Sequence, residues 1–204
     1  MATGAPADHS LMKLALAAIA LSILAGLLAG GRFSNLAAST IRWPGLAVAG
    51  LALQVAPVPG RLLPMILLYV SFAVLAVFAA SNIRTVGFAL VLLGVAMNFT
   101  VIAVDGGMPV TRHALIASGQ SSTLSLLIHD GGAKHHLAGS GDHLLALADV
   151  IAVPGVDQAM SAGDVATYAG VMCVIVACMR RRRVPDDPLP VTRVVHGFRP
   201  DVGR

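Results

Sequence analysis

The sequence predicts an all-α integral membrane protein, a polytopic helical bundle with about five membrane-spanning segments. Three observations lead to this fold class. Apolar residues make up 56% of the 204 residues and charged residues only 12%, about half the charged fraction of a typical soluble domain. The apolar residues gather in long runs. The lysines and arginines lie mostly between and after these runs, with a bias that gives the runs an orientation.

Five apolar runs are candidates for membrane spans, and they cover residues 11–31, 45–58, 62–80, 86–104 and 165–179. The first, third and fourth runs are long enough to cross a hydrocarbon core about 30 Å thick. The second run is the weakest candidate, because it is short and contains Gln54 and Pro57. The fifth run reaches membrane length if its helix begins near Ser161.

The positively charged residues predict how the bundle is oriented. Four consecutive arginines, 180–183, follow the fifth run and place this end in the cytoplasm, on the inner side of a plasma (inner) membrane. Counting back through five spans puts ten of the fourteen basic residues inside and the N-terminus outside. A cleaved signal peptide at the first run would move Arg32 and Arg42 outside, against this bias, so we favour an uncleaved span.

The spans divide the chain into an outside N-terminal segment (1–10), a transmembrane domain (11–180) and a basic, disordered cytoplasmic tail (181–204). Residues 105–163 form one long loop outside the membrane, and a loop of this length usually carries function or local structure. Within this loop the apolar stretch 143–153 is too short to span. We expect it to form a short helix that lies at the outer membrane interface or re-enters the membrane there.

Three aspartates are expected to meet at the outer face, where polar side chains beside apolar segments are costly and usually functional. Asp105 follows the fourth span, Asp149 lies within the apolar stretch of the loop, and Asp164 opens the fifth span. Asn98 lies on the outer half of the fourth span. Two close carboxyl groups in a poorly hydrated site share a proton, so one can activate water while the other protonates a leaving group. Asp149 and Asp164 are the candidate catalytic pair.

Each of these residues also has a structural interpretation. Asp164 lies in an S-x-x-D pattern, which caps the start of a helix. Asp149 could face water or pair with a basic residue of the loop. The sequence Asp105-Gly106-Gly107 is a turn signature. Its functional interpretation is a binding pocket formed by exposed backbone amides and the Asp105 carboxylate.

The loop is rich in histidine, and His135 and His136 are candidate binding residues. No H-x-x-x-H or H-E-x-x-H spacing is present, so we expect neither a metal site nor another cofactor. The basic residues are explained by topology and do not alternate with aromatic residues, so no nucleic-acid partner is expected. The expected partners are membrane lipids and a membrane-embedded peptide or lipid substrate. The sequence does not indicate an oligomeric state.

Several motifs in combination resemble those of a known family. They are NFTVIAVDGGMPV (98–110), the KHH stretch (134–136), LALADVIAVPG (145–155) and SAGDVATYAG (161–170). Together they resemble a bacterial membrane-protein family catalogued as domain-of-unknown-function family 5317, over most of residues 15–180. The resemblance implies a membrane protein without an established activity. In that family the position of Asp105 is more usually asparagine, which implies that no ionised group is required there.

The placement of two aspartates is also similar, more distantly, to lipoprotein signal peptidase, a four-span membrane aspartic protease. In that family one catalytic aspartate precedes a short outer-face helix and the other opens the last span. The stretches ADVI (148–151) and SAGD (161–164) resemble these two positions in order and separation. The G-N-x-x-D-R element of that family is absent, and Val165 stands where that family has serine.

Two classes of function therefore remain open beside a purely structural role. The first is an intramembrane hydrolase with Asp149 and Asp164 as an aspartate dyad. The second is a non-enzymatic lipid- or solute-binding membrane protein or permease component, in which the same carboxylates bind cationic groups or relay protons.

Overall fold

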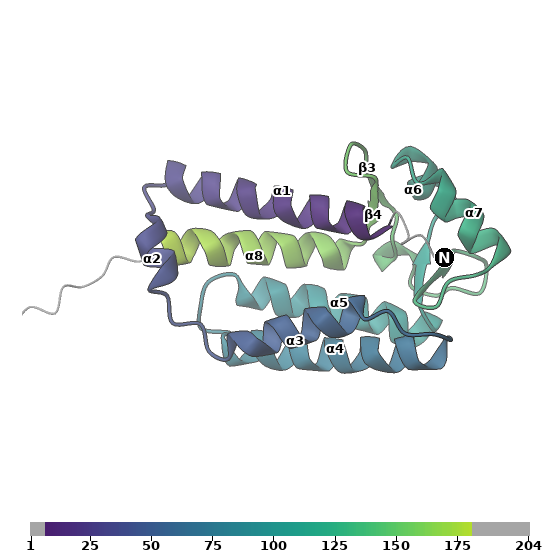
Figure 1. Cartoon of the computed structure of the whole chain (residues 1–204), viewed down its shortest axis with the longest axis horizontal. Helices are drawn as coiled ribbons and strands as arrows, with labels where there is room; N and C mark the ends of the chain where they lie inside the picture. Colours follow the sequence, from purple (N-terminus) through teal and green to yellow (C-terminus); the bar gives the residue numbers. More distant parts are fainter. Residues whose placement is uncertain (1–6, 181–204) are drawn as a thin grey trace, which may run out of the picture.

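The structure, a computed structural model, describes residues 7–180. The expected basic tail over 181–204 and the beginning of the expected outside segment therefore lie outside the described residues. Within the described range the chain forms eight α-helices, one 3-10 turn and four short strands (Figure 1). The helices are α1 (Ala7–Leu28), α2 (Phe33–Ala37), α3 (Pro44–Val55), α4 (Leu62–Ser81), α5 (Phe88–Asp105), α6 (Arg112–Ala117), α7 (Ser121–His129) and α8 (Ala162–Arg180). The other elements are β1 (Met108–Val110), β2 (His135–Leu137), η1 (Leu145–Leu147), β3 (Ile151–Val153) and β4 (Gln158–Met160).

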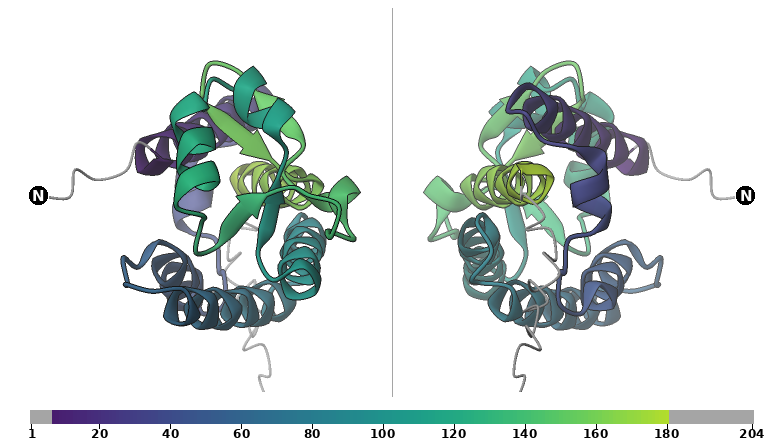
Figure 2. Two further views of the ribbon diagram at one scale, coloured as in Figure 1. Left: turned by 90° about the vertical axis from the view of Figure 1, so that its right-hand side faces the viewer. Right: turned by 90° about the vertical axis from the view of Figure 1, so that its left-hand side faces the viewer.

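The five longest helices, α1, α3, α4, α5 and α8, run along the long axis of the molecule (Figure 1). The short helix α2 lies at one end of them, which we call the α2 end. Residues 106–161 cover the opposite end, which we call the loop end. Viewed along the helices, the five form an open arc in the order α3, α4, α5, α8, α1, in which each helix packs on the next (Figure 2). Helices α1 and α3 are therefore the two edges of the arc.

Three helices are long and apolar enough to cross a membrane: α4, α5 and α8, with 20, 18 and 19 residues, or about 27–30 Å of helix each. Apolar helices expected over 62–80 and 86–104 are thus confirmed, and α8 begins at Ala162, where the fifth run needed its helix to begin. Helix α3 has only 12 residues, about 18 Å. Helix α1 has 22 residues, and the part of it whose side chains the structure describes includes the apolar stretch Leu16–Leu28.

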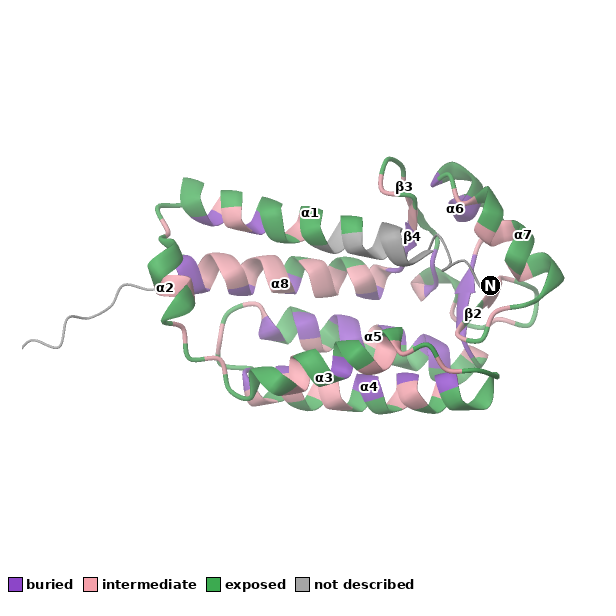
Figure 3. Cartoon of the chain, viewed as in Figure 1, coloured by how far each residue is buried: buried purple, intermediate pink, exposed green. Residues whose placement is uncertain are grey.

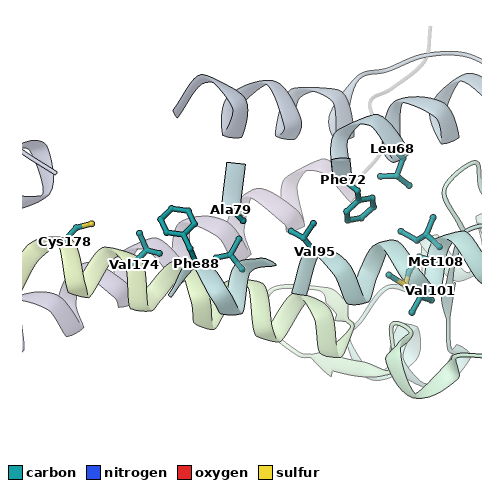
Figure 4. Packing of buried hydrophobic residues seen from close by; sticks show 11 residues of the cluster. Leu68, Phe72, Ala79, Phe88, Val95, Val101, Met108, Val174 and Cys178 are labelled. Atoms are coloured by element: carbon teal, nitrogen blue, oxygen red, sulfur yellow. The ribbon is translucent and has the colours of Figure 1, made fainter. Parts of the chain in front are cut away.

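A core of buried apolar side chains lies between α4, α5 and α8 (Figure 4). Phe72 on α4, Val95 on α5 and Val174 on α8 belong to it. These helices also carry exposed residues on their outer faces (Figure 3). Many of the exposed residues are large and apolar, such as Val77 and Leu93. Apolar surface on both sides of a helix suits a bundle that packs inward on itself and outward on lipid.

Helices α5 and α8 approach each other closely because glycines face glycines. A Cβ atom added to Gly94 would lie 2.3 Å from the carbonyl oxygen of Gly163, and one added to Gly87 would lie 2.4 Å from that of Gly170. Seven residues, close to two helical turns, separate the two glycines on each helix, so both contacts lie on one face. Small residues at such positions let membrane helices pack backbone against backbone. This contact brings the start of α8 against the middle of α5.

The loop end contains strands that the sequence did not predict. Strand β1 pairs in parallel with β2, and β3 pairs antiparallel with β4. The helix expected over 143–153 is wrong, because only Leu145–Leu147 forms a 3-10 turn and the chain then extends into β3. The extended form is stabilised by an isolated β-bridge between Asp149 and Val110, and the β-branched residues that follow Asp149 favour a strand. The fold is therefore mostly helical rather than all-α.

Candidate functional site

Asp149 is held by its main chain beside β1. Its N–H donates to the carbonyl of Pro109 at 3.0 Å, and its carbonyl accepts from the N–H of Thr111 at 3.2 Å. The residue is only 6% exposed. Burial, and secondly the charge of Asp164, raises the pKa of Asp149 to about 8. The Asp149 carboxyl group is therefore mostly protonated at neutral pH.

Asp164 belongs to a hydrogen-bond network at the start of α8. Its N–H donates to Ser161 Oγ at 2.9 Å, and the N–H of Ser161 donates to Asp164 Oδ2 at 3.0 Å. This reciprocal arrangement is a capping box, so the cap expected from the S-x-x-D pattern is confirmed. Asn98 on α5 extends the network, because its Nδ2 donates to Asp164 Oδ1 at 2.7 Å and its Oδ1 accepts from Ser161 Oγ at 2.8 Å.

The network cross-links α5 and α8 inside the bundle. Ser161 is fully buried and Asn98 is 8% exposed, so their polar atoms depend on each other for hydrogen bonds. The sequence indicated Ser161 as a helix cap but not as the partner of Asn98. A local spacing pattern signals a cap, whereas a contact between residues far apart in the sequence leaves no such pattern.

One cavity brings together four of the residues that the sequence singled out. Asn98, Asp149, Asp164 and His135 all line a cavity of about 420 Å³ inside the arc of helices. The other walls are mainly apolar and include Ala18 and Ile19 of α1, Leu51 of α3, Phe72 of α4, Val95 of α5 and Val171 of α8. A cavity of this size, with apolar walls and a few convergent polar groups, has the features of a small-molecule site.

The two histidines of β2 face different carboxylates, as alternation along a strand requires. His135 Nε2 lies 3.9 Å from Asp149 Oδ2, which is beyond hydrogen-bond distance. His136 Nε2 lies 2.8 Å from Asp142 Oδ1. Among the residues whose positions the structure describes, no group of three histidine, cysteine or carboxylate side chains is arranged to hold a metal ion.

Asp105 is an anchor for the loop and does not line the cavity. Its carboxylate accepts hydrogen bonds from the N–H groups of His143 at 2.9 Å and Leu144 at 3.3 Å, and its side chain has no exposed surface. Gly106 adopts the left-handed conformation, with φ 70°, that ends α5. The N–H groups of Gly106 and Gly107 both donate to one carbonyl in the last turn of α5. These two amides are therefore already hydrogen-bonded within the turn, and a part for these residues in binding stays a prediction.

A second, smaller hollow of about 170 Å³ adjoins the cavity at the loop end, and His135 lines both. We call this hollow the polar groove; it is lined by Arg61, Asp105, Gly106, Gly107 and residues 132–136. Its cationic side chains attach the loop to α3 and α4. Arg61 Nη2 donates to the carbonyl of Gly132 at 3.4 Å, and Lys134 Nζ donates to the carbonyl of Gln54. The sequence indicated Arg61 as an orienting charge, and Lys134 also as a possible partner of Asp149 and as part of the KHH motif; it did not indicate that the two residues line one groove.

The sequence profile of a family of unknown function, DUF5317, matches residues 38–176. The chain belongs to this family. The matched region runs from before α3 into α8 and contains every residue of the polar groove and the four polar cavity residues named above. The match confirms the family resemblance that the motifs indicated. DUF5317 is a family of unknown function, so the match does not assign an activity. No curated protein and no solved structure matches this DUF5317 chain, so the more distant similarity to lipoprotein signal peptidase stays a prediction.

Proposed function

We propose that this DUF5317 protein is a multi-pass membrane protein that holds an apolar or amphipathic molecule in the cavity inside its helix arc. The observation that carries the proposal is the lining of the cavity. Most of its wall consists of apolar side chains from five helices. Its polar part consists of Asp149, Asp164, Asn98 and His135. Such a lining accepts an apolar chain along the helices and a polar group beside the carboxyls.

In this proposal α1 and α3 complete a bundle of five membrane segments in the plasma membrane. The α2 end faces the cytoplasm and the loop end faces outside. Three arginines lie in the connections between helices at the α2 end, namely Arg32, Arg42 and Arg84. They support this orientation because arginines are retained on the cytoplasmic side. Helix α3, at about 18 Å, would reach only part of the way across the bilayer.

The protonation of Asp149 suits an apolar environment. A neutral carboxyl group beside an apolar ligand costs far less free energy than a buried carboxylate. A protonated Asp149 can also donate a hydrogen bond to a carbonyl or hydroxyl oxygen of the ligand. His135, whose Nε2 lies 3.9 Å from Asp149 Oδ2, can accept or donate according to its tautomer.

The test of this function is to fill the cavity from its walls. Ala18→Trp and Leu51→Trp each add an indole to the cavity lining, from α1 and α3 respectively. Leu24→Trp and Val48→Trp add the same group at exposed positions of the same helices. We expect native mass spectrometry to detect bound lipid on the wild type and both controls, and to detect its loss from both cavity variants. Equal lipid retention by all five proteins would refute the proposal.

A second candidate function is hydrolysis by an aspartate dyad. The observation that favours it is that Asp149 and Asp164 line one cavity in different environments, the first mostly protonated and the second hydrogen-bonded by Asn98 and Ser161. In this mechanism Asp164 accepts a proton from water as the water oxygen adds to a carbonyl carbon of a membrane-embedded peptide or lipid ester. Asp149 then donates its proton to the leaving nitrogen or oxygen as the bond to carbon breaks.

Hydrolysis and binding are separated by replacing each carboxyl group with an amide. If the dyad is catalytic, Asp149→Asn and Asp164→Asn each fail to complement a deletion strain while still retaining lipid in the cavity. Asp157→Asn is the matched control, because the Asp157 side chain is 53% exposed on the turn between β3 and β4. Full complementation by both cavity variants would exclude the dyad and leave the binding function standing.

A further inference from the structure

The polar groove carries positively charged side chains, whereas the cavity holds two carboxyl groups. Arg61 and Lys134 contribute two positive charges, and His135 and His136 contribute further hydrogen-bonding groups. Asp105 also belongs to the lining, but its carboxylate is engaged by backbone N–H groups and has no exposed side-chain surface. The accessible side chains of the groove are therefore suited to an anion. Burial lowers the pKa of the Lys134 ammonium, and a bound anion would oppose that shift.

The groove lies at the level where the apolar helix α4 begins and the apolar helix α5 ends. Arg61 is the N-cap residue of α4, and Asp105 is the last residue of α5. If α4 and α5 cross the bilayer, the groove lies where the hydrocarbon region meets the lipid headgroups. Cationic side chains at this depth are positioned to contact lipid phosphates.

The groove and the cavity are neighbours. His135 lines both hollows. Lys134, in the groove, donates to the carbonyl of Gln54, and Gln54 also lines the cavity. An amphipathic ligand with its polar group in the groove can therefore reach the cavity with its apolar chain by passing beside His135.

The cavity reaches both edges of the helix arc. Ala18 and Ile19 line it from α1, and Leu51 and Gln54 line it from α3. In the end views α1 and α3 are the outermost helices on the two sides of the arc's opening (Figure 2). In a membrane this opening faces the lipid acyl chains rather than water.

Building on the proposed function, we propose that the polar groove binds the phosphate of an anionic phospholipid whose acyl chain occupies the cavity, and that the lipid enters sideways between α1 and α3. Arg61 and Lys134 select the headgroup by its charge. The apolar walls from α1, α3 and α4 hold the chain. Asp149 and Asp164 lie beside the bound lipid, at the polar part of the cavity.

The experiment compares phosphatidylglycerol with phosphatidylcholine of identical acyl chains, titrated onto the delipidated full-length protein and followed by native mass spectrometry. Each lysine or arginine near a headgroup contributes on the order of fivefold in affinity for an anionic lipid. Two such residues predict that the wild type prefers phosphatidylglycerol by about 30-fold. The double variant Arg61→Gln/Lys134→Gln is expected to lose this preference, because its affinity for phosphatidylglycerol falls much more than its affinity for phosphatidylcholine.

Two further variants make the result specific. Arg61→Lys/Lys134→Arg keeps both charges and is expected to keep the preference, which shows that charge and not a folding defect is measured. Lys13→Gln/Arg112→Gln removes two positive charges outside the groove lining and is expected to behave as the wild type. A loss of preference in this second variant would overturn the assignment of the preference to the groove.

The remaining outcomes separate this inference from the function on which it rests. If the wild type binds both lipids equally and Leu51→Trp blocks both, the cavity binds lipid and the headgroup inference is overturned. If Leu51→Trp blocks neither lipid, the proposed function itself fails. If inorganic phosphate alone binds as tightly as phosphatidylglycerol, the groove is a site for a soluble anion and the lipid inference is overturned.

Discussion

Replacing Asp149 by asparagine is expected to remove most of the dependence of folding stability on pH between about 4 and 8. In the folded chain, burial together with the charge of Asp164 raises the pKa of Asp149 to about 8 from the ordinary value of 3.8. Between these two values the folded chain retains a proton that the unfolded chain has released. Unfolding therefore releases one proton, and the free energy of unfolding falls by about 1.4 kcal/mol for each pH unit of increase.

The sign and size follow directly from these two pKa values. The folding stability that the protonated Asp149 carboxyl group contributes is fully present below about pH 4, declines as the pH rises, and is absent above about pH 8. Between pH 5 and pH 7 the wild type is expected to lose about 3 kcal/mol. The side chains that line the cavity with Asp149, namely His135, Asp164 and Tyr168, remain in the variant. The difference between wild type and variant therefore isolates the contribution of Asp149.

The assay is reversible unfolding in detergent micelles over pH 5 to 9, with the wild type, Asp149→Asn and Asp157→Asn measured in parallel. At low pH the wild type and Asp149→Asn should have similar stability, because a protonated carboxyl and an amide are nearly the same size. At high pH Asp149→Asn should be the more stable of the two, since it carries no buried charge. Parallel pH profiles for wild type and Asp149→Asn would refute the assignment of a raised pKa to this carboxyl group.

Three further substitutions test the packing and the caps. Gly94→Ala should destabilise the bundle by about 1–3 kcal/mol, since its Cβ would meet the backbone of α8. Gly45→Ala, which has open space around its Cβ, should be neutral or stabilising. Thermal unfolding compares the two variants directly, and equal midpoints would contradict the close contact between α5 and α8. Ser161→Ala should cost about 1–2 kcal/mol, because it removes both the α8 cap and a donor to Asn98, and an unchanged midpoint would speak against the network. Asp105→Asn should be milder than Asp105→Ala, because an amide oxygen still accepts from one of the two loop N–H groups, and protease sensitivity of the loop is expected to rise in the order wild type, Asn, Ala.

The parts of the fold that the sequence could predict are those with a local pattern. The apolar runs that became α4, α5 and α8 are long and nearly free of charge, and this is a property of consecutive residues. The capping box between Ser161 and Asp164 has a fixed spacing of three. The turn at Gly106 needs a residue that tolerates positive φ, which glycine signals directly.

The parts that the sequence could not predict depend on contacts between distant residues. The stretch around Asp149 is apolar, and apolarity over eleven residues fits a buried strand as well as a helix. The stretch is extended rather than helical because the backbone beside β1 provides hydrogen-bond partners for Asp149. Arg61 and Lys134 line the same groove, and residues of α1 and α3 line the same cavity. These residues are far apart in the sequence, so no short motif indicates that they come together.

The proposed lipid site is tested most directly by finding where a lipid lies on the protein. Membranes containing the wild type are loaded with phosphatidylglycerol that carries a photoactivatable diazirine in its acyl chain, and the crosslinked residues are identified by peptide mass spectrometry. We expect crosslinks at Phe72 and Val95, which line the cavity and are 7% and 6% exposed. Crosslinks confined to outward-facing residues such as Val77 and Leu90 would contradict this expectation, because they would show lipid around the bundle and none inside the arc.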